Sequence, residues 1–245
     1  MKTLENHTLL YDKDCPMCEV YSNTFMKCGM LEKDGRENFS EMSAKNEILI
    51  DYERAKNEIA LINQNSREVS YGLDSLLVII GNSFPTLEKI GRVKPIYWFF
   101  KKFYSFISYN RKVIVPSSEL VTEKSCVPSF NLKYRLFYIF FSLAFSTFVF
   151  ENYLSKMFPL NRSFEIIFFL SVFGIMSQII FQPIFSKINF YNYIGNLMTV
   201  FLIGSFLLIP ISFIRLNPIF YCCYFISVSL VMSFDLHRRW KLLRI

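Results

Sequence analysis

YDKDCPMC, residues 11–18, is the stretch that decides the fold of the first half of this chain. It follows a short apolar run, Thr8–Leu10, which predicts a buried strand, and it precedes a segment at 19–27 that predicts a helix. The unpaired N–H groups and the dipole at a helix N-terminus favour a negative charge. A cysteine at such a position therefore has a lowered thiol pKa, and the thiolate is the form that acts as a nucleophile.

Five residues of this stretch are candidate site residues. Cys15 is the candidate nucleophile, and the two-residue spacer lets Cys18 resolve a mixed disulfide. Pro16 is predicted at the first helical position, where its missing N–H costs nothing. Asp12 is either a buried proton acceptor or a turn residue. Asp14 either raises the thiol pKa, if its carboxylate points to the sulfur, or caps the helix.

The rest of the first 90 residues predicts a small α/β layer. Its first helix is expected at 16–27, with Val20 and Phe25 inward, Tyr21 as a further inward candidate, and Cys28-Gly29 as the stop. The other expected elements are a short strand at 37–40, a helix at 43–55, a hairpin with strands at 59–62 and 67–71, a break at Gly72 and a helix at 73–80. About 90 residues can bury one modest core of this kind.

Residues 12–18, DKDCPMC, resemble the signature of the DCC family, a thioredoxin-like group of predicted thiol-disulfide oxidoreductases. VSYGLDS at 69–75 is similar to the family's strand, glycine and helix start, while Tyr104 and Asn110-Arg111 are similar to its closing tyrosine and Asn-Arg pair. The resemblance covers residues 8–116, and the family usually has glycine where this chain has Lys13. It implies a thioredoxin-like α/β fold and thiol-disulfide exchange.

The second half of the chain has a different composition. From residue 134 onward it is mostly Phe, Ile, Leu, Ser and Tyr, with few charges. A membrane-spanning helix needs about 20 apolar residues. The sequence therefore predicts an all-α transmembrane domain of about four helices, with spans near 134–150, 166–186, 193–214 and 216–234, of which the first is short.

These observations define a domain organisation. The thioredoxin-like domain is expected at 1–116, and its last segment, 95–115, is a basic, aromatic hinge helix. The remaining expected segments are a linker at 117–133, the transmembrane domain at 134–236 and a basic tail at 237–245. The hinge helix packs on its own sheet or contacts anionic lipid, and both hold if different faces are used.

The net charge of +7 is unevenly distributed. Residues 1–91 carry 10 basic and 15 acidic side chains, whereas residues 92–116 carry 6 basic side chains and no acidic one. A nucleic-acid-binding protein would have its basic residues clustered on a soluble domain, so that class of partner is not expected.

Lysine and arginine in the flanks of the spans predict the orientation. Basic residues precede the first expected span and follow the last, while the loops hold few, so both termini are expected in the cytoplasm. Residues 1–20 have no apolar signal segment, which agrees with a cytoplasmic first domain. The protein is expected in a bacterial plasma membrane with the Cys-x-x-Cys in the reducing compartment, where such a pair is more often catalytic or metal-binding than structural.

Four other cysteines leave alternatives open. Cys28 is expected to pack at the end of the first helix. Cys126 is a free linker thiol or a mixed-disulfide partner of Cys15, and Cys222-Cys223 are two small packing residues or a redox relay. Zinc prefers four ligands and the Cys-x-x-Cys supplies two, so no metal or cofactor is expected beyond the dithiol.

The sequence thus predicts a membrane-anchored protein-disulfide reductase that acts on a protein or small-molecule disulfide. One alternative is a membrane interaction or carrier protein whose first domain is a docking module with vestigial cysteines. Another is an oxidant or isomerase on the outer face, against which the flank charges argue. An exposed Cys15 at a helix N-terminus would favour chemistry, and a buried, inert Cys15 would favour docking.

Overall fold

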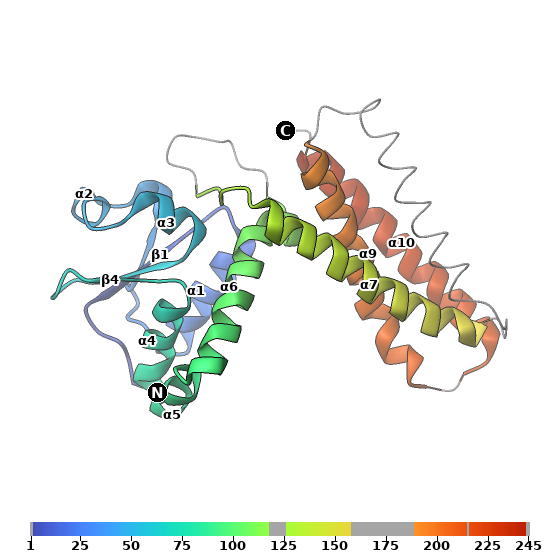
Figure 1. Ribbon diagram of the computed structural model, residues 1–245, viewed down its shortest axis with the longest axis horizontal. Coiled ribbons are helices and arrows are strands. Elements are labelled where there is room, and N and C mark those ends of the chain that lie inside the picture. Colours follow the sequence, from blue (N-terminus) through green and yellow to red (C-terminus); the bar gives the residue numbers. More distant parts are fainter. Residues whose placement is uncertain (1, 118–125, 158–188, 215, 244–245) are drawn as a thin grey trace. The chain divides into compact units, whose positions relative to one another are not determined.

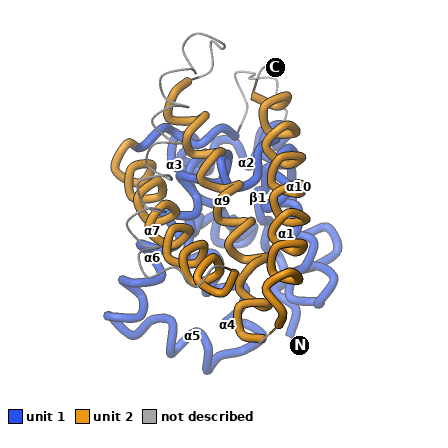
Figure 2. The backbone as a smooth tube through the Cα atoms, turned by 90° about the vertical axis from the view of Figure 1, so that its right-hand side faces the viewer, with its two compact units in different colours: residues 1–131 blue, residues 132–245 orange. Residues whose placement is uncertain are grey.

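The computed structural model describes residues 2–117, 126–157, 189–214 and 216–243. The chain divides into two compact units, Met1–Asn131 (unit 1) and Leu132–Ile245 (unit 2), which Figure 2 shows in different colours. Residues 126–131, expected in a linker, therefore belong to the first unit.

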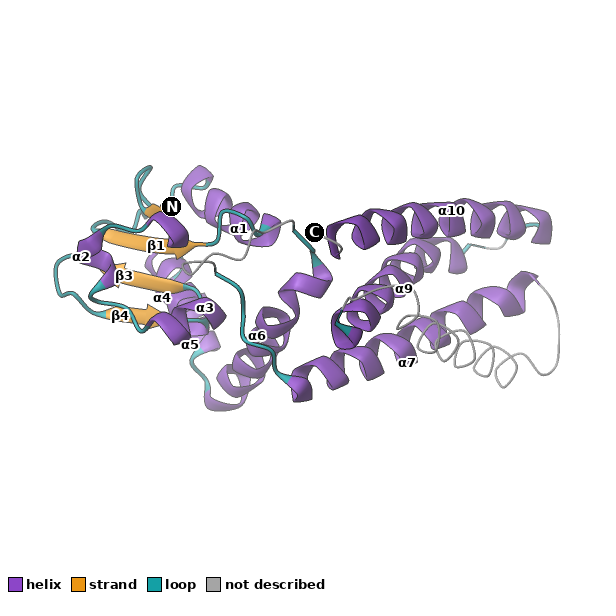
Figure 3. Cartoon of the chain, turned by 90° about the horizontal axis from the view of Figure 1, so that it is seen from above, coloured by secondary structure: helices purple, strands orange, loops and turns teal. Residues whose placement is uncertain are grey.

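Unit 1 is built on a four-stranded mixed sheet (Figure 3). The strands are β1 (His7–Tyr11), β2 (Arg36–Asn38), β3 (Ala60–Asn63) and β4 (Val69–Tyr71), and their order is β2-β1-β3-β4. β1 pairs parallel with β2, with Leu9 opposite Arg36, and antiparallel with β3, with Leu9 opposite Leu61. β3 and β4 form the expected antiparallel hairpin.

Helices cover both faces of this sheet (Figure 1). They are α1 (Pro16–Lys27), a 3-10 turn (Phe39–Glu41), α2 (Ala44–Glu47), α3 (Tyr52–Asn57), α4 (Leu73–Ser83), α5 (Pro85–Gly91) and α6 (Lys94–Ile114). Successive strand residues point to opposite faces. Leu9 and Leu61 accordingly join a core beneath α1, α4 and α6, whereas Leu10 and Ile62 join a second core beneath the 39–57 segment.

Two expectations for unit 1 are wrong. The helix expected at 43–55 is two short helices, because the side chain of Asp51 accepts a hydrogen bond from the Arg54 N–H and starts a new helix there. Ile48, in the break, is 84% exposed. Val20 is also outward, at 66% exposed, because the inward face of α1 is formed by Cys18, Ser22, Tyr21 and Phe25.

Unit 2 contains three helices that are long and apolar enough to cross a membrane: α7 (Leu132–Met157), α9 (Phe190–Ser212) and α10 (Pro218–Leu243). The span expected at 166–186 lies outside the described residues. The first span, expected to be short, is a 26-residue helix. α10 likewise continues through the expected basic tail, and Arg239 in its last turns is buried.

Contacts within unit 2 fix the directions of its helices. Arg135, near the start of α7, donates to Asn192 Oδ1 near the start of α9 at 3.2 Å. Arg239, near the end of α10, donates to Asn196 Oδ1 at 3.1 Å. At the other end, the Tyr153 hydroxyl of α7 donates to the Tyr221 carbonyl of α10 at 3.0 Å. α7 and α9 therefore run in the same direction, and α10 runs opposite to both.

Candidate functional site

The turn after β1 positions the Cys-x-x-Cys. The backbone N–H of Cys15 donates to the carbonyl of Asp12 at 3.2 Å, and the Cys15 carbonyl accepts from the Glu19 N–H at 3.0 Å. Cys15 is thus the N-cap residue of α1, with extended backbone angles, and Pro16 begins the helix as predicted. The N-terminus of α1 is formed around the first cysteine of the pair.

The two thiols of the pair are buried and unequal, and no disulfide joins them in this structure. Cys15 is 1% exposed and Cys18 is 4% exposed. A hydrogen bond from the Cys18 thiol lowers the pKa of Cys15 to about 6 against the effect of burial, and the Cys18 N–H and the Arg111 guanidinium lower it further. The same hydrogen bond, together with burial, raises the pKa of Cys18 far above its usual range. These opposite shifts favour the thiolate at Cys15 and the proton on Cys18.

Asp12 lies beside this pair. The two sulfurs and a carboxylate oxygen of Asp12 are all within 4.8 Å of one another. Asp12 Oδ1 accepts from the Asp14 N–H at 3.1 Å, and Oδ2 lies 3.4 Å from Arg111 Nη2. Asp12 is therefore a turn residue whose carboxylate is buried and ion-paired, so it combines features of both alternatives drawn from the sequence.

Arg111 connects the pair to the rest of unit 1. Its Nη2 atom has two hydrogens and four neighbouring acceptors, namely Asp12 Oδ2, the Lys56 carbonyl at 3.2 Å, and the carbonyl and Sγ of Cys126, the sulfur at 3.2 Å. Its Nε atom is buried and has no hydrogen-bond partner among the described residues. The sequence assigned Arg111 no role beyond its likeness to a family motif, so its place at the thiols is a site feature that sequence reasoning missed.

Cys126 is not an open linker thiol. It is buried in the core cluster with Leu10 and Ala55, and burial raises its pKa to about 11, although Arg111 opposes this. A cavity of about 10 Å³, room for about one water molecule, lies where Cys18, Arg111 and Cys126 meet. Cys126 is a protonated side chain that closes the pocket behind the pair.

Tyr21 lines this pocket, and Tyr104 contacts Ile59, another residue of its wall. The Tyr21 hydroxyl is buried and faces Cys18, and burial followed by the charge of that neighbouring thiol raises the Tyr21 pKa well above its usual range. The Tyr21 hydroxyl has no hydrogen-bond partner among the described residues, although it lies close enough to affect the pKa of the Cys18 thiol. The Tyr104 hydroxyl instead accepts from the Ile59 N–H at 2.9 Å and ties α6 to the start of β3. Tyr104 therefore helps to hold α6, and with it Arg111, over the sheet.

A metal does not fit this site. Asp12, Cys15 and Cys18 supply three donor atoms, whereas zinc prefers four. The buried Arg111 guanidinium already contacts the Asp12 carboxylate, and a cation placed between the thiols would lie beside this fixed positive charge.

The remaining sequence candidates lie elsewhere. Asp14 is exposed and is not the helix cap, because Cys15 occupies that position. Cys28 ends α1 as expected, but it is exposed rather than packed. Cys222 and Cys223 are not joined by a disulfide in this structure; Cys222 packs against the core of unit 2 and Cys223 is exposed on α10.

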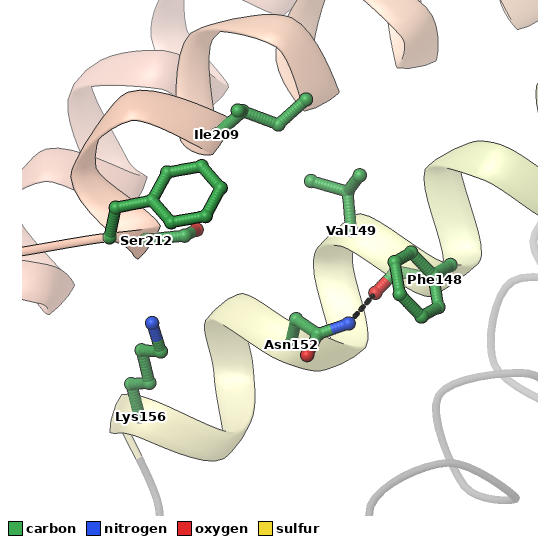
Figure 4. Close-up of a pocket in the computed structure, with 7 residues that line it drawn as sticks. Phe148, Val149, Asn152, Lys156, Ile209 and Ser212 are labelled. Carbon is green, nitrogen blue, oxygen red and sulfur yellow. Dashed lines mark hydrogen bonds between the residues drawn. The ribbon is translucent and has the colours of Figure 1, made fainter.

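A larger cavity of about 270 Å³ lies in unit 2, between the ends of α7 and α9 (Figure 4). Its walls are mainly apolar. The Asn152 amide donates to the Phe148 carbonyl at 2.9 Å and the Ser212 hydroxyl to the Leu208 carbonyl at 3.0 Å, so both groups bond within their own helices. Lys156 is the one charged residue among the described residues that line the cavity, and they include no cysteine, histidine or carboxylate that would make it a reactive site.

Comparison with family models, curated proteins and solved structures gave no match to this chain.

Proposed function

We propose that this protein is a membrane-anchored thiol-disulfide oxidoreductase in which Cys15 attacks and Cys18 resolves. The observation that carries the proposal is the inequality of the two thiols. Cys15, at the N-terminus of α1, has a pKa lowered to about 6, while Cys18 keeps its proton. A reactive cysteine needs a thiolate near neutral pH, and a resolving cysteine must stay protonated until it is needed.

The proposed reaction balances within the pair and one substrate disulfide. The Cys15 thiolate attacks one sulfur, forms a mixed disulfide and releases the other sulfur as a thiolate. Cys18 then gives up its proton and attacks Cys15, which releases the second substrate thiolate and leaves a Cys15–Cys18 disulfide. Two electrons have moved to the substrate, and a dithiol reductant must restore the pair. Asp12, which has a carboxylate oxygen within 4.8 Å of the Cys18 sulfur, is the group that we assign to take the Cys18 proton.

The architecture of unit 1 supports a thioredoxin-like assignment. The strand order β2-β1-β3-β4, the parallel pairing of β1 with β2 through α1, and the antiparallel hairpin followed by α4 form the arrangement that such folds use. The Cys-x-x-Cys follows β1, as it does in that arrangement. The DCC family resemblance is part of the same proposal, with Cys15, Cys18 and Arg111 as its residues in this chain.

One observation favours a second candidate, a docking module with vestigial cysteines. Cys15 is 1% exposed, so a folded protein substrate does not reach it in this conformation. If the protein is an oxidoreductase, the residues that bury Cys15 must move aside during the reaction. The two candidates therefore differ in whether Cys15 reacts with an added disulfide.

A trapping experiment separates the two candidates. In the full-length Cys18→Ser variant, Cys15 keeps its position but has no resolving partner, so incubation with oxidised glutathione is expected to leave a stable Cys15–glutathione disulfide, seen as a mass shift on the Cys15 peptide. The Cys15→Ser/Cys18→Ser variant is the matched control and must give no such peptide. A Cys15 that stays unmodified while the exposed Cys28 reacts would favour the docking module.

We also infer a four-span topology with both termini in the cytoplasm. α7 and α9 run in the same direction, so a chain that crosses the membrane in both must cross back between them. The expected span at 166–186, outside the described residues, falls in that interval. Arg135 and Arg239 lie at the same end of the bundle, both against the start of α9, and the positive-inside rule assigns that end to the cytoplasm.

A further inference from the structure

Unit 1 has an apolar surface on α5 and α6 that its own core does not use. We call it the α5–α6 surface, and it consists of six side chains that are each 46% to 64% exposed: Leu87, Ile90, Trp98, Phe99, Phe100 and Phe103. The Phe99 and Phe103 rings stack at 6.3 Å, and Phe99 and Phe100 meet edge to face at 5.6 Å. Scattered single apolar residues are normal on a surface, but a contiguous aromatic patch marks an interaction site.

The two halves of α6, which is green in Figure 1, have different surroundings. Its second half packs into unit 1 through Ser108, Asn110, Arg111 and Val113, all buried. Its first half contacts unit 1 on one side, where the Tyr97 hydroxyl donates to Asp74 Oδ2 of α4 at 3.0 Å. The aromatic residues of this half point away from the core, so the two uses that the sequence left open fall on different parts of the helix.

Charge identifies the occupant of this surface. Residues 92–116 contain 6 basic and no acidic side chains. Lys94, Lys101 and Lys102 are exposed on the same helix as the aromatic residues, and in the described part of the chain none of them forms an ion pair. A partner must therefore offer both an apolar region and negative charge.

We propose that the α5–α6 surface docks onto an anionic phospholipid bilayer at headgroup depth. Tryptophan and phenylalanine enter the boundary between headgroups and acyl chains, while lysines on the flank bind lipid phosphates, as in amphipathic helices that lie on membranes. The helices of unit 2 are long and apolar enough to cross the same membrane, so unit 1 is covalently held near its surface. Docking needs no oxidoreductase activity and stands independently of it.

Docking would also constrain the thiol site. The same helix that carries the lipid-binding aromatics at its start carries Arg111 at its other end, against Asp12 and Cys126. A docked α6 therefore holds the thiol pair in a fixed orientation to the membrane, which suits a substrate that is itself at or in the membrane.

Trp98 reports on this docking directly. The chain has two tryptophans, so full-length Trp240→Phe leaves Trp98 as the sole tryptophan, which is excited selectively over the tyrosines at the long-wavelength edge of its absorption band. The protein is placed, one copy per disc, in nanodiscs that contain a headgroup-level quencher lipid, with either phosphatidylcholine alone or phosphatidylcholine plus phosphatidylglycerol. We expect strong quenching with phosphatidylglycerol, weaker quenching without it, and loss of the difference at high salt.

Charge variants give the matched control. Lys101→Gln/Lys102→Gln is expected to lower the ratio of docked to undocked protein by about 30-fold, whereas Lys33→Gln/Lys45→Gln, which removes two exposed charges elsewhere on unit 1, leaves it unchanged. Absence of quenching, or quenching that ignores phosphatidylglycerol and salt, would overturn the proposal. Quenching that changes only when two copies share a disc would assign the surface to a second copy and would overturn it as well.

Discussion

At the scale of single residues, the proposed function depends on how two neighbouring sulfurs share one proton. Cys15 and Cys18 have the same side chain, and their difference comes from position. Cys15 accepts at the start of α1 from the thiol and N–H of Cys18, whereas Cys18 is one turn inside the helix and next to Tyr21. Arg111 adds a positive charge that favours the Cys15 thiolate.

The first prediction concerns the pH dependence of Cys15. Its alkylation by iodoacetamide, followed on the Cys15 peptide by mass spectrometry, should have a midpoint near pH 6 because the Cys15 pKa is lowered to about 6. Cys18→Ala removes the main hydrogen-bond donor and should move the midpoint upward. A wild-type midpoint near the ordinary thiol pKa of about 8.5 would contradict the assignment.

The lowered pKa of Cys15 also makes the stability of the fold depend on pH. A thiol whose pKa is lower in the folded state stabilises the fold above its unfolded pKa of about 8.5. This contribution is lost as the pH falls through about 6. The stability difference between the wild type and Cys15→Ser should therefore shrink on acidification across that window, measured by thermal unfolding in detergent at a series of pH values.

The second prediction concerns the buried Asp12–Arg111 pair. Arg111→Met leaves the Asp12 carboxylate buried without its cation, which should cost about 3–5 kcal/mol of unfolding free energy. Adding Asp12→Asn should recover part of the loss, because the uncompensated charge is gone. Thermal unfolding of the single and double variants measures this coupling.

An exposed ion pair provides the comparison. Arg92 lies 2.8 Å from Glu88 with both side chains partly exposed, so Arg92→Met should cost about 0–1 kcal/mol. An Arg111→Met variant no less stable than Arg92→Met would show that the Asp12–Arg111 pair does not hold the site together.

At the scale of elements, a single glycine sets the start of α4. Gly72 has φ +61 and ψ −126, a conformation that other residues adopt only with strain. A Cβ at this position would lie 3.0 Å from Glu58 Oε2 and 3.2 Å from Tyr104 Cε1. Gly72 thus lets β4, α4 and α6 meet closely.

The third prediction uses a matched pair of glycines. Gly72→Ala should destabilise the protein by about 1–3 kcal/mol, from backbone strain and from contact with Glu58 and Tyr104. Gly29→Ala, with φ +69 but nothing within 4 Å of its Cβ, should cost only the backbone term of about 1 kcal/mol. Equal losses in thermal unfolding would show that the close contact at Gly72 is unimportant.

The sequence predicted those elements whose signals are local. β1, α1 with Pro16 at its first position, the hairpin and the break at Gly72 follow from runs of apolar residues between turn formers. The helix at 43–55 was wrong because the capping interaction of Asp51 outweighed a weak periodicity. The place of Cys126 was not predictable, since its burial depends on Arg111, a contact across 15 residues that no spacing reveals.

The sequence likewise predicted the local contacts of the candidate site but not its long-range contacts. Cys15, Cys18 and Asp12 lie within one turn of chain, so their proximity follows from sequence. Arg111 reaches Asp12 across 99 residues, and only the packing of α6 on the sheet through Tyr104 brings it there. The burial of Cys15 likewise depends on tertiary packing, and a local motif carries no information about it.

At the scale of the whole molecule, the directions of the helices in unit 2 predict which positions share a side of the membrane. The start of α7 and the end of α10 lie at one end of the bundle, and the end of α7 lies at the other. In the proposed topology, the basic residues around Arg135 and Arg239 assign the first of these ends to the cytoplasm.

The fourth prediction tests this topology by labelling. In a variant without the six native cysteines, Lys133→Cys and Lys241→Cys should react with a membrane-impermeant maleimide only from the cytoplasmic side of sealed vesicles. Lys156→Cys and Phe213→Cys, at the ends of α7 and α9, should react only from the opposite side. Labelling of Lys133→Cys and Lys156→Cys from the same side would mean that α7 does not cross.

The most direct test of the central claim is a redox titration of the Cys15–Cys18 pair in the full-length protein. The protein is equilibrated in detergent with dithiothreitol buffers of known potential, the free thiols are alkylated, and the Cys15–Cys18 disulfide is quantified by mass spectrometry. The account predicts a reversible two-electron transition near the thioredoxin value of about −270 mV. A pair that stays reduced at every potential, while the exposed Cys28 still oxidises, would contradict it and leave unit 1 as a docking module.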